Sequence, residues 1–147
     1  MYRWTCAIAT ILVSVHAAQA SFELVTVLDR GTKSVHRFDG ATGAYLGNFG
    51  SGYLISPESM AIDRTRARAY VMDASLGAIL VFNFNTGVHL FDIAPTPGRH
   101  QALSVAPNGN LIGGYYSGAT WEILDPNAGS LGYLFSSTTL FNPISLA

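Results

Sequence analysis

The sequence predicts an all-β fold built from short repeated strands, and three observations support this. After residue 20 the chain consists of short apolar runs rich in β-branched and aromatic residues. No helix-length amphipathic stretch interrupts them. A short phrase also recurs at intervals of 42 to 44 residues, which indicates a repeat architecture. The 147 residues are 49% hydrophobic and 12% charged, which excludes a disordered polar chain.

The charge balance excludes one class of partner. The chain has eight Lys and Arg residues and nine Asp and Glu residues, which gives a formal net charge of -1. Proteins that bind nucleic acid through a basic field need a clear excess of positive charge. We therefore expect no nucleic-acid partner, and a protein or small ligand of unknown identity instead.

Residues 1–20 have the pattern of a secretory signal peptide. A basic start is followed by an apolar run from Trp4 to Val15 and by Ala18-Gln19-Ala20, a typical cleavage sequence. A buried first helix or strand is the alternative. The run is shorter than the roughly 20 residues of a membrane span. We expect no membrane span, a secreted or periplasmic product, and removal of Cys6, the sole cysteine.

Two markers define the repeat in different registers. The first is a six-residue phrase: an apolar residue, Asx, two variable residues, a small residue or Thr, and Gly. It occurs three times, at 38–43, 82–87 and 124–129. The second is an apolar triplet at Met60-Ala61-Ile62 and Leu103-Ser104-Val105, which continues as Leu146-Ala147 with the same 43-residue spacing. Pro57 and Pro143 each stand three residues before their marker.

Each repeat is expected to contain four strands. The Asn108-Gly109 pair predicts a hairpin turn, because both residues tolerate positive φ. In the shared phrase, the Asx side chain would cap the turn between the third and fourth strands, and the Gly would take positive φ. The expected strands of the two complete repeats are 58–63, 69–73, 78–84 and 88–93, then 101–106, 111–116, 120–124 and 130–135.

Four antiparallel strands in a period near 43 residues predict the blades of a β-propeller. The stretch RFDGATGAYLGNF, followed by SPESMAID, resembles the NHL and YVTN-type propeller repeats. The resemblance covers nearly all of the chain after residue 20, and it implies a fold without implying an activity. No Trp-Asp dipeptide ends a blade, which disfavours WD40 repeats.

The predicted organisation is a partial propeller over residues 21–147. Blade one (21–54) lacks its first strand, blade two (55–98) and blade three (99–141) are complete, and 142–147 is the first strand of a next or shared blade. Three blades make an incomplete ring, because propellers have four to eight. Two explanations stay open: truncation of a longer propeller, or a homodimer that completes a six-bladed ring.

Two aspartates are candidate metal ligands. Asp29 and Asp73 end the second strands of successive blades, and carboxylates repeated at one rim could bind calcium. The favoured interpretation is structural: each Asp caps the turn that follows it. Calcium is therefore the one cofactor considered, and no other is expected.

Candidate ligand-binding residues lie in the loops between blades. Tyr53, Arg99 and His100 have the chemical reach to contact a ligand, and Arg99 beside His100 could hold an anion. Solvated loops are the alternative. Trp121 aligns with Val35 and Ile79 and is expected to pack between blades. Three arginines around one hairpin corner, at 64, 66 and 68, are expected to form a solvated edge.

No catalytic motif stands out, so the leading hypothesis is an exported, non-enzymatic propeller segment that acts as a binding or interaction scaffold. Thiol chemistry is excluded after signal removal, and no G-x-S-x-G or phosphate-binding loop is present. The alternative is part of a calcium-dependent lactonase or hydrolase-like propeller. Such an enzyme would be complete only as a dimer or within a longer chain.

Overall fold

The computed structural model describes residues 24–94, 100–115 and 120–136, and these contain no helix. They form eleven strands in three antiparallel sheets. The strands are β1 (Leu24–Asp29), β2 (Ser34–Asp39), β3 (Tyr45–Phe49), β4 (Pro57–Asp63), β5 (Arg68–Asp73), β6 (Ala78–Asn83), β7 (His89–Ile93), β8 (His100–Val105), β9 (Leu111–Tyr115), β10 (Thr120–Asp125) and β11 (Gly129–Ser136). The described part thus has no apolar helix long enough to cross a membrane.

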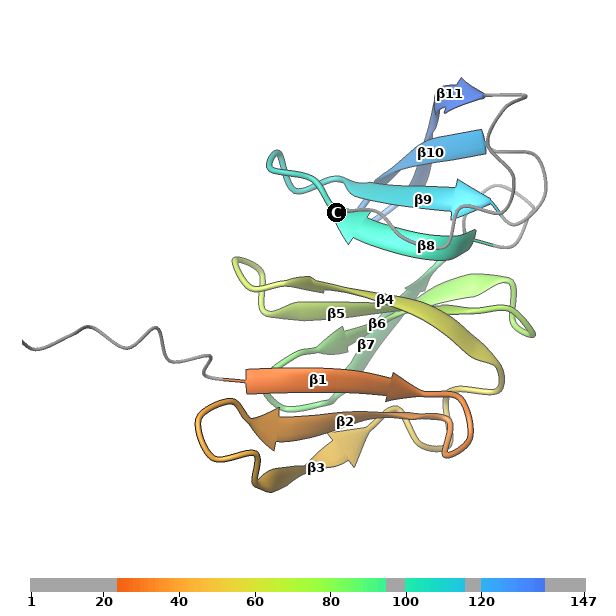
Figure 1. Cartoon of the computed structure of the whole chain (residues 1–147). Coiled ribbons are helices and arrows are strands. Elements are labelled where there is room, and N and C mark those ends of the chain that lie inside the picture. Colours follow the sequence, from red (N-terminus) through yellow and green to blue (C-terminus); the bar gives the residue numbers. More distant parts are fainter. Residues whose placement is uncertain (1–23, 95–99, 116–119, 137–147) are drawn as a thin grey trace, which may run out of the picture.

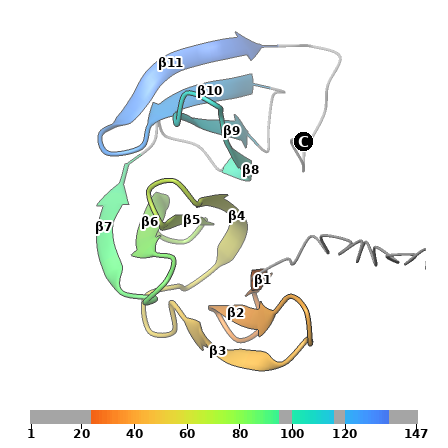
Figure 2. The same cartoon turned by 90° about the vertical axis from the view of Figure 1, so that its left-hand side faces the viewer.

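The three sheets stand side by side in an arc (Figure 1). Blade one is β1-β2-β3, blade two is β4-β5-β6-β7 and blade three is β8-β9-β10-β11, each in sequence order. Seen along the arc, the inner strands β4 and β8 lie near its centre, and β3, β7 and β11 lie at its periphery (Figure 2). The predicted fold class is confirmed: the sheets are propeller blades and their ring is not closed.

The shared phrase forms the same turn in all three blades, as predicted. The Oδ1 atoms of Asp39, Asn83 and Asp125 each accept backbone N–H groups two and three residues further on, at 2.7–3.1 Å. The glycines that end the phrase all have positive φ, and Gly43 lies at 71°. Because these contacts are local, the phrase sets where the third strand of each blade ends and the fourth begins.

Neighbouring blades are held together by two apolar clusters. The cluster between blades one and two includes Val35, Phe49 and Phe82, and the cluster between blades two and three includes Ile79, Met72 and Leu124. Successive residues of a strand point to opposite faces, so both faces of blade two are buried. Its two central strands read as almost continuous buried runs for this reason.

The face of blade one that points away from blade two is different. Val25 and Val27 of β1 are exposed on it, whereas Leu24 and Leu28 pack toward blade two. Phe38 and Tyr45 continue this apolar face, with ring centroids 5.5 Å apart. In the described part of the chain, β1 pairs with β2 on one edge alone. Blade one therefore presents an open face and an open inner edge.

The predicted signal peptide (1–20) and the predicted terminal strand (142–147) lie outside the described residues. Both remain predictions, as do the blade limits given above. The Asn108-Gly109 turn is present, with Gly109 N–H donating to the Ala106 carbonyl at 2.8 Å. It joins β8 to β9 at the corner that also forms the candidate site.

Candidate functional site

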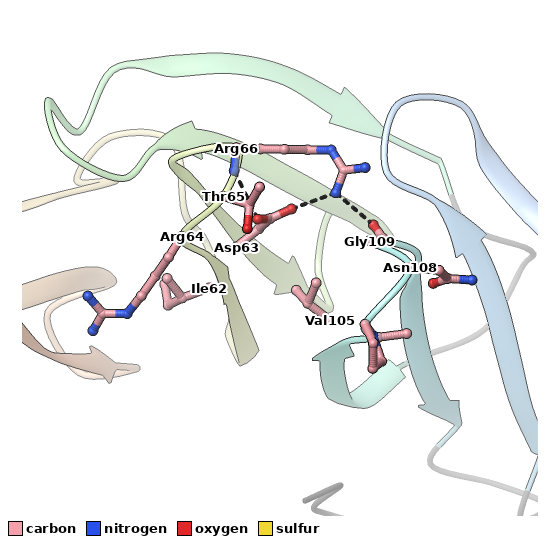
Figure 3. Close-up of a pocket in the computed structure, with 10 residues that line it drawn as sticks. Ile62, Asp63, Arg64, Thr65, Arg66, Val105, Asn108 and Gly109 are labelled. Atoms are coloured by element: carbon pink, nitrogen blue, oxygen red, sulfur yellow. Dashed lines mark hydrogen bonds and ion pairs between the residues drawn. The ribbon is translucent and has the colours of Figure 1, made fainter.

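A pocket of about 510 Å³ opens where blades two and three meet. Its lining comes from two equivalent corners, the β4–β5 turn of blade two and the β8–β9 turn of blade three (Figure 3). The lining residues are Ile62, Asp63, Arg64, Thr65, Arg66, Val105, Ala106, Pro107, Asn108 and Gly109. The inner strands β4 and β8 end at this pocket, at Asp63 and Val105.

An ion pair on one wall of the pocket is hydrogen-bonded to the other wall. Arg66 Nη1 lies 2.7 Å from Asp63 Oδ2 and donates to the Gly109 carbonyl at 3.1 Å. The Arg66 backbone N–H also donates to Asp63 Oδ1 at 2.9 Å. Gly109 has no side chain, and a Cβ there would collide with the Arg66 guanidinium. Blade three therefore accepts this arginine because its corner carries a glycine.

Asp63 and Arg66 are both charged, and their opposite charges cancel. Burial acts to raise the pKa of Asp63, but the hydrogen bonds and charge of Arg66 outweigh it and lower the pKa. The same hydrogen bond to Asp63 raises the pKa of Arg66. Asp63 is buried and Arg66 is exposed, so the arginine covers the carboxylate from solvent. The pair supplies fixed dipoles to the pocket without a net charge.

The other lining groups combine apolar and polar chemistry. Ile62 and Val105 are half-buried and offer hydrocarbon surface, while Thr65 and Asn108 are exposed and carry hydrogen-bonding groups. The Arg64 guanidinium turns away toward blade one, where it donates to the Leu24 carbonyl at 3.4 Å and lies over the Phe84 ring. The pocket thus suits a small polar ligand without charge.

Arg64 and Arg66 are exposed, as a solvated edge requires, but all three arginines of this corner also contact neighbouring blades. Arg66 reaches Gly109 of blade three, and Arg64 reaches Leu24 of blade one. Arg68 donates to Asn127 Oδ1 at 2.8 Å in blade three and lies over the Phe91 ring. These contacts were not predicted because the partners belong to other repeats, at distances in sequence that no local pattern reveals.

Tyr53 lies at the periphery of the arc. Its ring is 53% exposed and stacks on His89 of the outer strand β7, with centroids 4.6 Å apart. His89 Nε2 lies 2.8 Å from Asp92 Oδ1. Tyr53 is therefore not part of the pocket at the inner corner, and its role as a ligand-binding residue stays a prediction.

The other two predicted ligand residues are less fully described. Arg99 lies outside the described residues. The backbone of His100 begins β8 and is paired with Tyr115 of β9. An anion site at Arg99 and His100 stays a prediction.

Asp73 and Asp29 both cap the turns that follow them, as the favoured interpretation predicted. Asp73 is fully buried, and its two oxygens accept four backbone N–H groups, from Ile55, Ser56, Ser75 and Leu76, at 2.7–3.1 Å. Asp29 accepts the Gly31 N–H at 2.7 Å. In the described ranges no three His, Cys, Asp or Glu residues are grouped around a metal-sized space. Calcium binding stays a prediction.

A buried carboxylate in blade three was not predicted. Glu122 of β10 is fully buried, and the Tyr115 hydroxyl donates to its Oε2 at 2.9 Å. Glu122 occupies the repeat position of Leu80, an apolar residue in blade two. Trp121 is buried at the position of Val35 and Ile79, and its packing between blades stays a prediction.

Four-stranded antiparallel blades, inter-blade apolar clusters and a pocket between neighbouring corners define a protein of the β-propeller fold. Solved structures agree. The chain matches hydrazine synthase of Kuenenia stuttgartiensis with a TM-score of 0.68 and 15% identity over 84% of this chain and 35% of that chain. It matches the WD40 β-propeller domain of Doa1 with a TM-score of 0.60 and 13% identity over 78% and 37%.

A third similar structure comes from a Bacteroides fragilis protein named as exported, with a TM-score of 0.64 and 17% identity over 86% of this chain and 38% of that chain. This chain thus spans less than half the length of each of these proteins. At such identities the likeness concerns the fold alone. No family model and no curated protein matches the chain in sequence.

Proposed function

We propose that the chain is an exported β-propeller scaffold that binds a small, polar, uncharged ligand without transforming it. The observation that carries the proposal is the pocket between blades two and three, with its neutral Asp63–Arg66 pair. The signal-like pattern of residues 1–20 supports export, and so does the name of the Bacteroides fragilis neighbour. Membership among NHL or YVTN-type repeats is part of the same proposal.

The lining supports an uncharged ligand for an electrostatic reason. Asp63 and Arg66 satisfy each other, so a charged ligand would have to give up its hydration without gaining a free counter-charge. A neutral ligand avoids this cost, packs on Ile62 and Val105, and bonds to Thr65 or Asn108. The contacts come from both blades, so the ligand would stabilise their junction as well.

The test is a titration followed by the backbone amide NMR signals of the full chain. Acetamide and glycerol are the neutral probes, and inorganic phosphate is the charged one. We expect the neutral probes to shift the signals of Thr65, Asn108 and Gly109 in a saturable manner. No shift, or a shift with phosphate alone, would overturn the proposal.

A matched pair of variants locates the binding. Thr65→Trp fills the mouth of the pocket, and Ala41→Trp puts the same ring on the exposed β2–β3 turn of blade one. Saturable shifts should disappear in Thr65→Trp and persist in Ala41→Trp. Equal behaviour of the two variants would place binding elsewhere.

The protein partner that we propose is a second copy of this chain. Two such arcs would provide six blades, within the usual range for closed propellers, and a two-fold axis would relate them. The open face of blade one, with Val25 and Val27, supports a blade-like partner because neighbouring blades bury such faces. Light scattering over a concentration series should report the mass of two chains, and a monomer throughout would overturn this proposal.

A further inference from the structure

Blade two shows how the first strand of a blade is attached. Asp73 Oδ1 accepts the N–H groups of Ser75 and Leu76 in its own turn, at 3.0 and 3.1 Å. Its Oδ2 accepts the N–H groups of Ile55 and Ser56 at 2.7 and 2.8 Å, immediately before β4 begins at Pro57. One buried carboxylate therefore ties the start of the first strand to the turn between the second and third strands.

Blade one has the same carboxylate with half of these contacts. Asp29 lies at the repeat position of Asp73, and its Oδ1 accepts the Gly31 N–H at 2.7 Å. Its Oδ2 accepts the Thr32 hydroxyl at 2.9 Å, and the side chain is 41% exposed. The hydrogen bonds from Thr32 and Gly31 lower its pKa, so the carboxylate is charged. It offers an acceptor where blade two receives a strand.

The sequence contains a second segment with the pattern of the strand that Asp73 holds. Residues 54–61 read Leu-Ile-Ser-Pro-Glu-Ser-Met-Ala, and residues 140–147 read Leu-Phe-Asn-Pro-Ile-Ser-Leu-Ala. Four residues are identical at identical spacing, and Phe141 and Asn142 take the places of Ile55 and Ser56. The second segment therefore has the sequence of a first strand together with its leading linker.

We infer that Asp29 is the latch of a strand exchange between two copies of the chain. The backbone N–H groups of Phe141 and Asn142 of the partner copy donate to Asp29 Oδ2, and the partner's residues 143–147 pair with the open edge of β1. This rests on the proposed dimer and names the contact that closes it. A second copy fits better than the same chain, whose own strand would close a ring of only three blades.

The first test compares two turn-capping aspartates at different places in blade one. Asp29→Ala and Asp39→Ala each remove one negative charge and one turn cap, and a threonine hydroxyl lowers the pKa of each carboxyl. We expect Asp29→Ala to raise the dimer dissociation constant at least about tenfold, since it removes hydrogen bonds to a charged acceptor. Asp39→Ala should leave it within about twofold.

A second pair of variants works from the other side of the contact. Asn142→Pro removes the N–H group that Asp29 would accept, and Asn142→Ala keeps it. We expect dissociation in the proline variant alone, with blade signals unchanged in circular dichroism. This pair decides the matter even where Asp29→Ala fails to fold.

Hydrogen exchange separates failure of the latch from failure of the dimer. In the dimer, the amides of Phe141 and Asn142 should be protected, and Asp29→Ala should remove that protection. A dimer in which both aspartate variants behave alike and these amides exchange freely would overturn the latch alone. A chain that is monomeric at every concentration would overturn the dimer and the latch together.

Discussion

The two junctions between blades solve the same packing problem with different chemistry. Between blades one and two, the contact is apolar and aromatic: the Phe82 ring meets Phe49 at 5.4 Å and the edge of Tyr53 at 6.0 Å. Between blades two and three, an apolar cluster is joined by the buried Glu122 and by the Asp63–Arg66 pair. The pocket lies at the second junction. The stacking of blades requires apolar faces. Polar groups at such a junction therefore indicate a candidate site.

The largest effect is expected from truncation in the aromatic junction. Phe82 is fully buried, so Phe82→Ala should lower the free energy of unfolding by about 3–5 kcal/mol. Leu90→Ala, at an exposed position of the neighbouring strand β7, is the control and should have little effect. Chemical denaturation measures both. Similar losses in the two variants would show that the aromatic cluster does not hold this junction.

A smaller loss is expected from a buried polar contact inside blade three, beside the second junction. Tyr115→Phe removes the hydroxyl that donates to the buried Glu122 and should cost about 1–3 kcal/mol. Tyr133→Phe removes a hydroxyl from an exposed ring on the adjacent strand and serves as the control. If the two variants unfold alike, the Glu122 contact contributes nothing to the stability of the fold.

The Asp63–Arg66 pair should make the second junction sensitive to acid. The pKa of Asp63 is lowered in the folded chain, so its stabilisation is present above the unfolded pKa near 3.8. It is lost as the pH falls through the lower, folded pKa. The arginine is exposed to solvent, which screens the pair, so we expect a small contribution. Asp63→Asn and Arg66→Ala should each flatten the pH dependence of unfolding below pH 4.

The double variant provides the check on this pair. Residues that act on each other give non-additive losses. The Asp63→Asn, Arg66→Ala double variant should therefore lose less than the sum of the two single variants. Additive losses, or an unchanged acid dependence, would contradict a stabilising ion pair.

The smallest effect is expected from calcium. Asp73 belongs to the first junction, where both of its oxygens accept backbone N–H groups. A cation would have to displace these bonds, so we expect added calcium to leave the melting temperature unchanged. A clear increase that disappears when Asp29→Asn and Asp73→Asn are combined would support the calcium-dependent alternative instead.

The sequence predicted the blades well because their signals are local. The Asx residue and glycine of each shared phrase lie within six residues, and the turn that they form sets the strands beside it. The period-two runs then show which segments pair. Nothing about these features depends on how one blade is placed against the next.

The candidate site could not be predicted in the same manner. Asp63, Arg66 and Gly109 meet because two blades stack at a particular twist, and no short pattern encodes that twist. One signal was available: Arg66 and Gly109 are 43 residues apart, so they occupy equivalent corners of successive repeats. The stacking of Tyr53 on His89 was not predicted either, because it depends on how the linker between blades packs against β7.

The sheet order has a consequence for how the chain reaches its structure. Every strand pair in the described sheets joins strands that are consecutive in sequence. Each hairpin closes a short loop, so folding can follow the chain as it emerges, with little entropy lost at each step. The exchanged strand would be the exception, since it must find another molecule. Assembly would then be the slow, concentration-dependent phase of maturation, separable in time from the folding of the blades.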